Sequence, residues 1–323
     1  MRALIIFILI ISNFCFCGKT HQTTFQHRPI KVLIIIFNPI IESKNHQKLT
    51  DLFNWYDPDS LSRVYISDLE EVSGGQLTYQ IVKRLEVDEF PVKLDGFRCD
   101  DQSFLLCWEN RQECHQPDQV DYNAIIKDFN IISQIEQGAI DEVWLFGFPY
   151  GGFWESTMAG KDAFFCNSDP IPDTDYCSRR FIIMGFNYER GVGCMLEDFG
   201  HRTESIMSHV FKNVKKEDNL WEKFILYDKV ASGKSNCGNV HFAPNSEKDY
   251  DWGNERYVLS NCDDWFNFPD FKGIVRKVNC KEWGNGDIRE HHKWWLKHIP
   301  KAEGTTNGIF NNWWYYMIDC NNN

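Results

Sequence analysis

Three short apolar runs limit the folds that this chain can adopt. Residues 31–37 read KVLIIIF, residues 142–148 read EVWLFGF and residues 181–186 read FIIMGF. Each run is continuously apolar, which is typical of a strand covered on both faces. Helical spacing of apolar residues falls between them at 122–136 and after them at 192–211. This order predicts an α/β fold in which a parallel or mixed sheet is flanked by helices.

Weaker patterns complete the outline. We expect a short strand at 63–66, another at 76–86 and a disulfide-closed loop at 102–119. The last third is different, because residues 233–285 are rich in Asn, Asp, Gly, Trp and Cys and have little periodicity. A helix is expected at 288–299 and a short strand or packed tail at 313–318. We therefore divide the chain into a signal peptide (1–18), an α/β domain (19–230) and a loop-rich, disulfide-stapled, Trp- and Cys-rich cap or small second domain (231–323).

The start of the chain indicates export. Met1 and Arg2 precede the apolar segment ALIIFILII, and small residues follow around Gly18. This pattern predicts a cleaved signal peptide, with an uncleaved anchor as the alternative. Ten of the twelve cysteines lie beyond this segment, and an even number in an exported chain predicts disulfides, with Cys166 and Cys177 close enough in sequence to close a local loop. We expect a secreted, extracellular protein with no membrane span after cleavage.

The charge balance narrows the partners. Asp and Glu total 46 against 34 Lys and Arg, which gives a formal net charge of −12. Nucleic acids and anionic membranes attract basic surfaces, so neither is expected as the main partner.

Polar and aromatic residues follow three of the predicted strands. In open α/β sheets, ligands bind beyond the carboxyl ends of the strands. Glu155 and Glu189 are the catalytic candidates, because a carboxyl group there can donate or accept a proton, although each could instead pair with an arginine or cap a helix. The substrate-binding candidates are Asn38, Tyr150, Trp154, Asn187 and Arg190. This interpretation requires no cofactor.

The helix expected at 192–211 carries a second candidate site. Glu197, His201 and Glu204 fall within one narrow stripe, and with His241 they could bind a divalent metal such as zinc. The H-E-x-x-H pattern is absent, and a solvated helical face is the simpler interpretation of the stripe. His201 lies about 13 Å along the helix from its first turn. We therefore expect it to lie apart from the candidates that follow the strands. Gly200 lies inside the helical pattern, which indicates that another backbone approaches the helix closely at this position.

Tryptophan is concentrated late in the chain. Eight of the twelve tryptophans lie from Trp221 onward, interleaved with Asn and Asp. Indoles stack on sugar rings, so this third could face a glycan, whereas a buried aromatic core is the alternative. The sequence hypothesis is a secreted hydrolase of an extracellular polymer, most simply a glycan, that uses strand-end carboxylates. Two alternatives remain: a metal-dependent hydrolase or peptidase, and a non-catalytic secreted protein that binds a glycan or partner.

Overall fold

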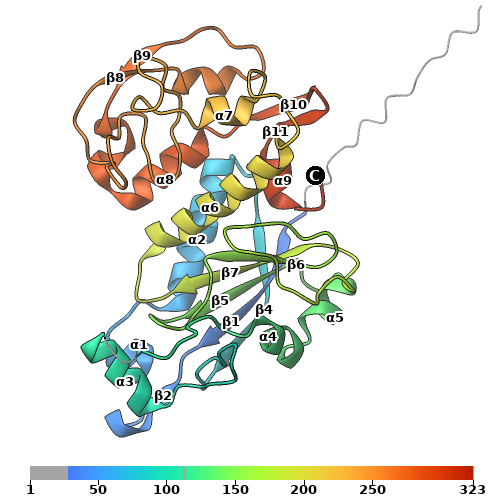
Figure 1. Cartoon of the computed structure of the whole chain (residues 1–323), viewed down its shortest axis with the longest axis vertical. Helices are drawn as coiled ribbons and strands as arrows, with labels where there is room; N and C mark the ends of the chain where they lie inside the picture. Colours follow the sequence, from blue (N-terminus) through green and yellow to red (C-terminus); the bar gives the residue numbers. More distant parts are fainter. Residues whose placement is uncertain (1–27, 112–113, 323) are drawn as a thin grey trace, which may run out of the picture.

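A five-stranded sheet forms the centre of the molecule (Figure 1). The computed structural model describes residues 28–111 and 114–322, so the predicted signal peptide lies outside the described residues. The strand order is β4-β1-β5-β7-β6. Four strands run parallel, and the fifth, β6, pairs antiparallel with β7. Their bounds are β1 (Ile30–Phe37), β4 (Tyr79–Val87), β5 (Glu142–Gly147), β6 (Ser156–Ala159) and β7 (Phe181–Asn187). The mixed sheet confirms the α/β class.

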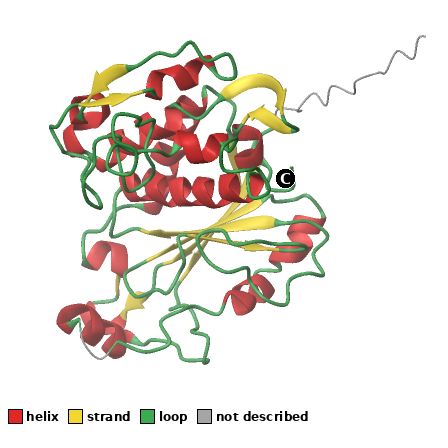
Figure 2. Ribbon diagram, turned by 45° about the horizontal axis from the view of Figure 1, so that its top comes forward, coloured by secondary structure: helices red, strands yellow, loops and turns green. Residues whose placement is uncertain are grey.

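Helices cover both faces of the sheet (Figure 2). On one face lie α2 (Pro58–Ser73) and α6 (Val192–Val210). The other face is covered by α4 (Tyr122–Asp128) and α5 (Ile131–Glu136). Because α2 joins β1 to β4, and α4 and α5 precede β5, successive crossovers lie on opposite faces, as expected of doubly wound sheets.

The apolar runs form strands because neighbours bury them on both faces. In β1 the side chains from Val32 to Ile36 are at most 1% exposed, and every residue of β5 is buried. The strand predicted at 63–66 is wrong, since these residues lie inside α2. Asp57 caps that helix and Pro58 follows at its first position, so helix signals begin before the short apolar run. The helix predicted at 122–136 is broken by Asn130, which has a φ of 52°.

Short elements make up the rest of the described chain. Near the N-terminus they are β2 (Ile40–Ile41), η1 (Glu42–Lys44), β3 (Gln47–Lys48), α1 (Leu49–Leu52) and α3 (Asp101–Asn110). The last third contains α7 (Leu220–Phe224), β8 (Val258–Ser260), η2 (Cys262–Asn267), β9 (Arg276–Val278), η3 (Cys280–Gly286), α8 (Ile288–Lys297), β10 (Lys301–Thr306), β11 (Ile309–Asn312) and α9 (Trp314–Ile318). Residues 314–318 are therefore helical and not a strand.

Aromatic side chains form the core of the last third. The rings of Trp221, Trp265 and Trp313 surround Phe224 at centroid distances of 5.1–5.7 Å. Seven of the eight late tryptophans are buried, and Trp294 is partly buried. The aromatic-core alternative therefore describes these residues better than an indole-covered glycan surface.

Most cysteines in the described chain are free. Its one disulfide joins Cys107 to Cys114, within the segment expected to be closed by such a bond. Cys166 and Cys177 are free, buried thiols and do not form the expected pair. The Cys166 sulfur lies 3.7 Å from the hydroxyl of Ser156, and the Cys177 thiol donates to a backbone carbonyl. The cysteines of the last third are also free thiols: Cys237, Cys262, Cys280 and Cys320.

Ion pairs fix α6 to the sheet and α8 to α2. Arg202 of α6 donates to Glu142 of β5 at 2.8 Å, and both side chains are buried. The same guanidinium donates to the carbonyl of Met317 near the C-terminus. Arg289 of α8 pairs with Asp68 of α2 through two hydrogen bonds. Within the described residues, no helix has the length and apolar character needed to cross a membrane.

Candidate metal centre

A cavity of about 520 Å³ opens beyond the carboxyl ends of β5 and β7. We call it the strand-end cavity. Its lining includes five residues selected from the sequence and several acidic and aromatic ones that were not. The selected residues are Tyr150, Glu155, Asn187, Arg190 and Glu197, and the additional ones include Asp118, Asp198, Tyr250 and Trp252.

Three of the other candidates lie elsewhere. Asn38 is buried and its amide donates to Thr50 and Glu86 in a separate pocket. Trp154 and Glu189 are not among the residues that line the strand-end cavity. Glu189 instead lies 3.7 Å from the guanidinium of Arg190, as its ion-pair alternative predicts.

The structure does not separate Glu155 from the helical stripe, contrary to expectation. The chain that leaves β5 turns back and becomes β6, which runs antiparallel to β7. The carbonyl of Glu155 accepts from the amide of Gly185, which is inside β7 and not at its end. This return carries Glu155 alongside α6, and its Oε2 lies 4.0 Å from Nε2 of His201. The sequence-based separation assumed that Glu155 stays at the strand end.

The last third covers much of the stripe on α6, although Glu204 stays partly exposed. Residues 239–250 of the last third cross it, and Glu197 is only 8% exposed. Glu204 Oε1 accepts from the backbone amide of Val240 at 3.0 Å. A Cβ on Gly200 would lie 2.6 Å from a methyl group of Val240, so the glycine permits this crossing. The close approach predicted at Gly200 is real, but it comes from a side chain and not from a backbone.

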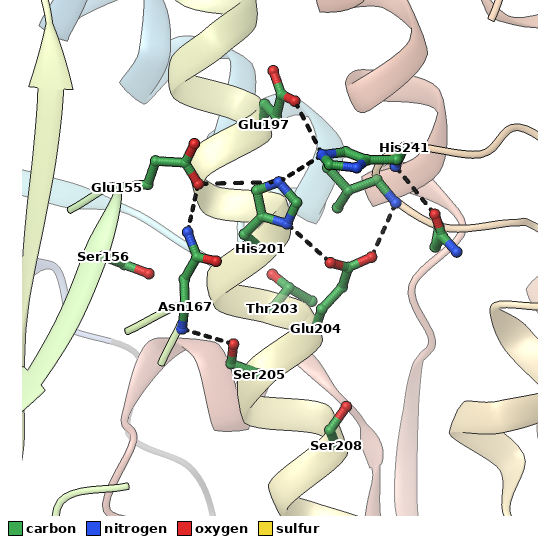
Figure 3. Close-up of polar contacts among 12 residues, drawn as sticks. Glu155, Ser156, Asn167, Glu197, His201, Thr203, Glu204, Ser205, Ser208 and His241 are labelled. Carbon is green, nitrogen blue, oxygen red and sulfur yellow. Dashed lines mark hydrogen bonds and ion pairs between the residues drawn. The ribbon is translucent and has the colours of Figure 1, made fainter. Parts of the chain in front are cut away.

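The imidazoles of His201 and His241 meet where this segment crosses α6 (Figure 3). His201 Nδ1 lies 3.0 Å from Glu204, and His241 Nδ1 lies 3.1 Å from Asp249. An ionised carboxylate only accepts, so each Nδ1 carries a proton, and each Nε2 presents a lone pair when its imidazole is neutral. The two Nε2 atoms are 3.1 Å apart, and Glu197 Oε1 is 3.5 Å from that of His241. Two lone pairs held this close repel each other unless a proton or a metal ion lies between them.

The electrostatics of the cluster favour such a cation. The hydrogen bond with Glu197 raises the pKa of His241, although burial opposes the shift. Burial lowers the pKa of His201, but the hydrogen bond with Glu204 and nearby carboxylates outweigh it, so this pKa is also raised. Burial opposes ionisation of Glu197, yet the surrounding histidines hold its pKa below the ordinary value. A positive charge at this position is therefore stabilised from several sides.

The distances suit a divalent metal. With bonds of about 2.0–2.1 Å to nitrogen and oxygen, a tetrahedral zinc ion separates its ligand atoms by about 3.3 Å. The observed separations of 3.1 and 3.5 Å bracket this value. One donor atom from each of Glu197, His201 and His241 lies within 4.8 Å of the others. Carboxylates that hold the second nitrogen of ligating histidines are a regular feature of zinc sites, and Glu204 and Asp249 occupy that position.

Two further groups border the cluster. Glu155 is held by the side-chain amide of Asn167, whose backbone amide donates to Ser205 on α6. The hydroxyl of Tyr250 lies 3.1 Å from His241 Nε2. Burial and the charge of Glu197 raise the pKa of Tyr250 to about 12, so its hydroxyl stays protonated and can donate. A carboxylate and a neutral donor thus border the three metal-binding residues.

Sequence reasoning missed Asn167, Asp249 and Tyr250. None lies in a periodic segment, and each reaches the cluster from a loop. The available signal was the position of Asp249 and Tyr250 eight and nine residues after His241, in a segment dense in acids and aromatics.

No protein-family model, curated protein or solved structure matches this chain. Its function is therefore inferred from the geometry of the site.

Proposed function

We propose that this chain is an exported, divalent-metal-dependent hydrolase that cleaves amide bonds in an extracellular polymer. Glu197, His201 and His241 hold the metal. The observation that supports this most strongly is the convergence of two Nε2 atoms and one carboxylate oxygen, while Glu204 and Asp249 contact the two Nδ1 atoms. On a solvated helical face, carboxylates would not be expected to hold both imidazoles by the same ring nitrogen.

Each neighbouring group has a role in hydrolysis. A bound zinc ion lowers the pKa of a coordinated water to about 7 and polarises a substrate carbonyl. Glu155, 4.0 Å from His201 Nε2, acts as the general base that accepts a proton from the attacking water. Asn167 keeps that carboxylate oriented. The protonated Tyr250 hydroxyl donates to the oxygen on which negative charge develops.

The charges of the strand-end cavity select the substrate class. Four acidic residues and Arg190 line it, but Asp118 pairs with Lys93, and burial raises the pKa of Asp198 well above its ordinary value. A bound divalent ion would offset the charge of the remaining carboxylates, Glu155 and Glu197, so the cavity would suit an uncharged chain. Peptides and N-acetylated glycans both offer amide bonds of this kind. A glycosidase that uses Glu155 and Glu189 is less well supported, because Glu189 does not line the cavity.

Amine release tests this proposal. The protein is stripped with a chelator and assayed on casein and on an N-acetylated oligosaccharide, before and after addition of Zn²⁺. We expect turnover on one of these amides only with metal, and loss of turnover in His201→Gln and Glu155→Gln, the latter with metal binding retained. His209→Gln is the matched control, because His209 is on the same helix and stacks on Phe164 outside the cluster.

Three results would contradict the proposal. The first is full activity of the metal-free protein. The second is equal activity of His201→Gln and His209→Gln. The third is failure of the protein to bind a divalent metal at all.

A further inference from the structure

A second group of metal-binding side chains lies in the last third, away from the strand-end cavity. Cys262 and Asp263 are the first residues of η2, and His298 follows the last turn of α8. One donor atom from each lies within 4.8 Å of the other two. None of the three lines the strand-end cavity. The group joins two segments that are more than thirty positions apart in the chain.

His298 presents to this group a ring nitrogen that makes no hydrogen bond and lies within ion-pair distance of Asp263. Its Nδ1 lies 2.7 Å from the carbonyl oxygen of Trp294, and a carbonyl only accepts, so Nδ1 carries the proton. Nε2 therefore has the lone pair. His298 is 3% exposed, and within the described residues its Nε2 has no hydrogen-bond partner. A buried acceptor without a partner is costly, whereas a metal ligand in this position is satisfied.

The spacing of the donors fits zinc. The Cys262 sulfur is 3.5 Å from Asp263 Oδ1, and His298 Nε2 is 3.8 Å from the same oxygen. With a Zn–S bond of about 2.3 Å and Zn–N and Zn–O bonds of about 2.0–2.2 Å, tetrahedral ligands lie about 3.3–3.6 Å apart. Small rotations of these side chains close the remaining difference.

Arg276 already orients the carboxylate for this role. Its guanidinium pairs with both oxygens of Asp263 and also with Glu282. A carboxylate accepts about four hydrogen bonds or ligand contacts, so Oδ1 keeps a free direction toward the sulfur and the imidazole. The Asp263 side chain is 32% exposed, which leaves solvent access for a water as the fourth ligand. Hydrogen-bonded carboxylates of this kind are typical of metal sites.

We propose that Cys262, Asp263 and His298 form a structural zinc site that fastens the end of α8 to η2. In this third, whose cysteines are free thiols, the metal supplies the cross-link that was expected from disulfides. Binding converts the Cys262 thiol to a thiolate and releases one proton to solvent.

Cobalt separates this site from the candidate metal centre. The chelator-stripped full chain is titrated with Co²⁺, because only a thiolate ligand gives an intense sulfur-to-cobalt band in the near ultraviolet. We expect that band in the unmodified chain, its loss in Cys262→Ser and His298→Gln, and its retention in Cys237→Ser. Cys237 is the matched control, since it is equally buried and its sulfur lies 4.0 Å from the carbonyl of Cys262.

His201→Gln distinguishes the two proposals. This variant should keep the thiolate band even though it loses metal at the other centre. A Co²⁺-loaded chain without the band, or a band that survives in both Cys262→Ser and His298→Gln, would overturn the second site. A Cys237–Cys262 disulfide found by peptide mapping of the unreduced protein would overturn it as well.

Discussion

Glu204 links the helix to the loop that carries His241. Its Oε2 contacts His201 Nδ1 at 3.0 Å, and its Oε1 accepts from the backbone amide of Val240 at 3.0 Å. Glu204→Gln keeps the length of the side chain and one oxygen for Val240, but removes the charge. The side-chain amide of the variant holds the His201 ring less firmly than a carboxylate does. The Nε2 lone pair is then directed less firmly at the metal.

The expected loss follows from the position of Glu204 behind a ligand. Removal of such a partner typically weakens metal binding about 10- to 100-fold. This corresponds to about 1.4–2.7 kcal/mol of binding free energy. The Glu204 side chain is 27% exposed, so solvent screens part of its charge and favours the lower half of that range. Glu204 also raises the pKa of His201, so at low pH the variant suffers less competition from protons.

Calorimetric titration of the chelator-stripped protein with Zn²⁺ at about pH 8 reduces this competition, because the pH then lies above the ordinary histidine pKa of about 6.5, from which the pKa of His201 is raised. Ser208→Ala is the control, because Ser208 continues the same helical stripe but contacts Trp221 and not the cluster. We expect weaker zinc binding at one site in Glu204→Gln and unchanged binding in Ser208→Ala. Equal zinc affinity of Glu204→Gln and the unmodified protein would refute the role of Glu204, provided that thermal unfolding shows both proteins to be folded.

Three predictions concern stability, each measured by denaturant unfolding. Arg202→Met leaves the buried Glu142 carboxylate unpaired and should lower the free energy of unfolding by about 3–5 kcal/mol; a loss below 1 kcal/mol would contradict this. His291 is fully buried with neither ring nitrogen bonded, and burial holds its pKa well below the ordinary value, so the native protein loses stability as pH falls through about 6.5. His291→Phe should remove up to about 1.4 kcal/mol of that loss per pH unit, whereas parallel pH profiles would show that His291 does not contribute. Gly200→Ala should cost about 1–3 kcal/mol through overlap with Val240, and Val240→Ala in the same chain should restore part of it; a neutral Gly200→Ala would mean that the loop moves freely.

The sequence predicts the sheet well because burial leaves a strong local pattern. The runs that became β1, β5 and β7 are continuously apolar, and the helical spacing of residues 192–211 gave α6 within one residue. Predictions were wrong where signals were short. Residues 63–66 resemble a strand only when the caps of α2 at Asp57 and Gly74 are ignored.

The candidate site was predictable in its parts but not in their arrangement. The sequence identified Glu155, Glu197, His201 and His241. It could not show that β6 runs back beside α6, which carries Glu155 to His201, because strand direction depends on pairing that is distant in sequence. Asp249 gives only a weak signal in the sequence, since its role depends on the fold of a loop.

The proposed hydrolase activity depends on a metal between His201, His241 and Glu197. Crystals of the full chain grown with Zn²⁺ and measured at the zinc absorption edge locate the ion directly. We predict an anomalous peak about 2.0–2.1 Å from Nε2 of both histidines and about 2.0–2.2 Å from a carboxylate oxygen of Glu197. Absence of a peak there, with the two Nε2 atoms still about 3 Å apart in the same crystals, would mean that a shared proton holds the imidazoles together, and would contradict the proposed metal centre.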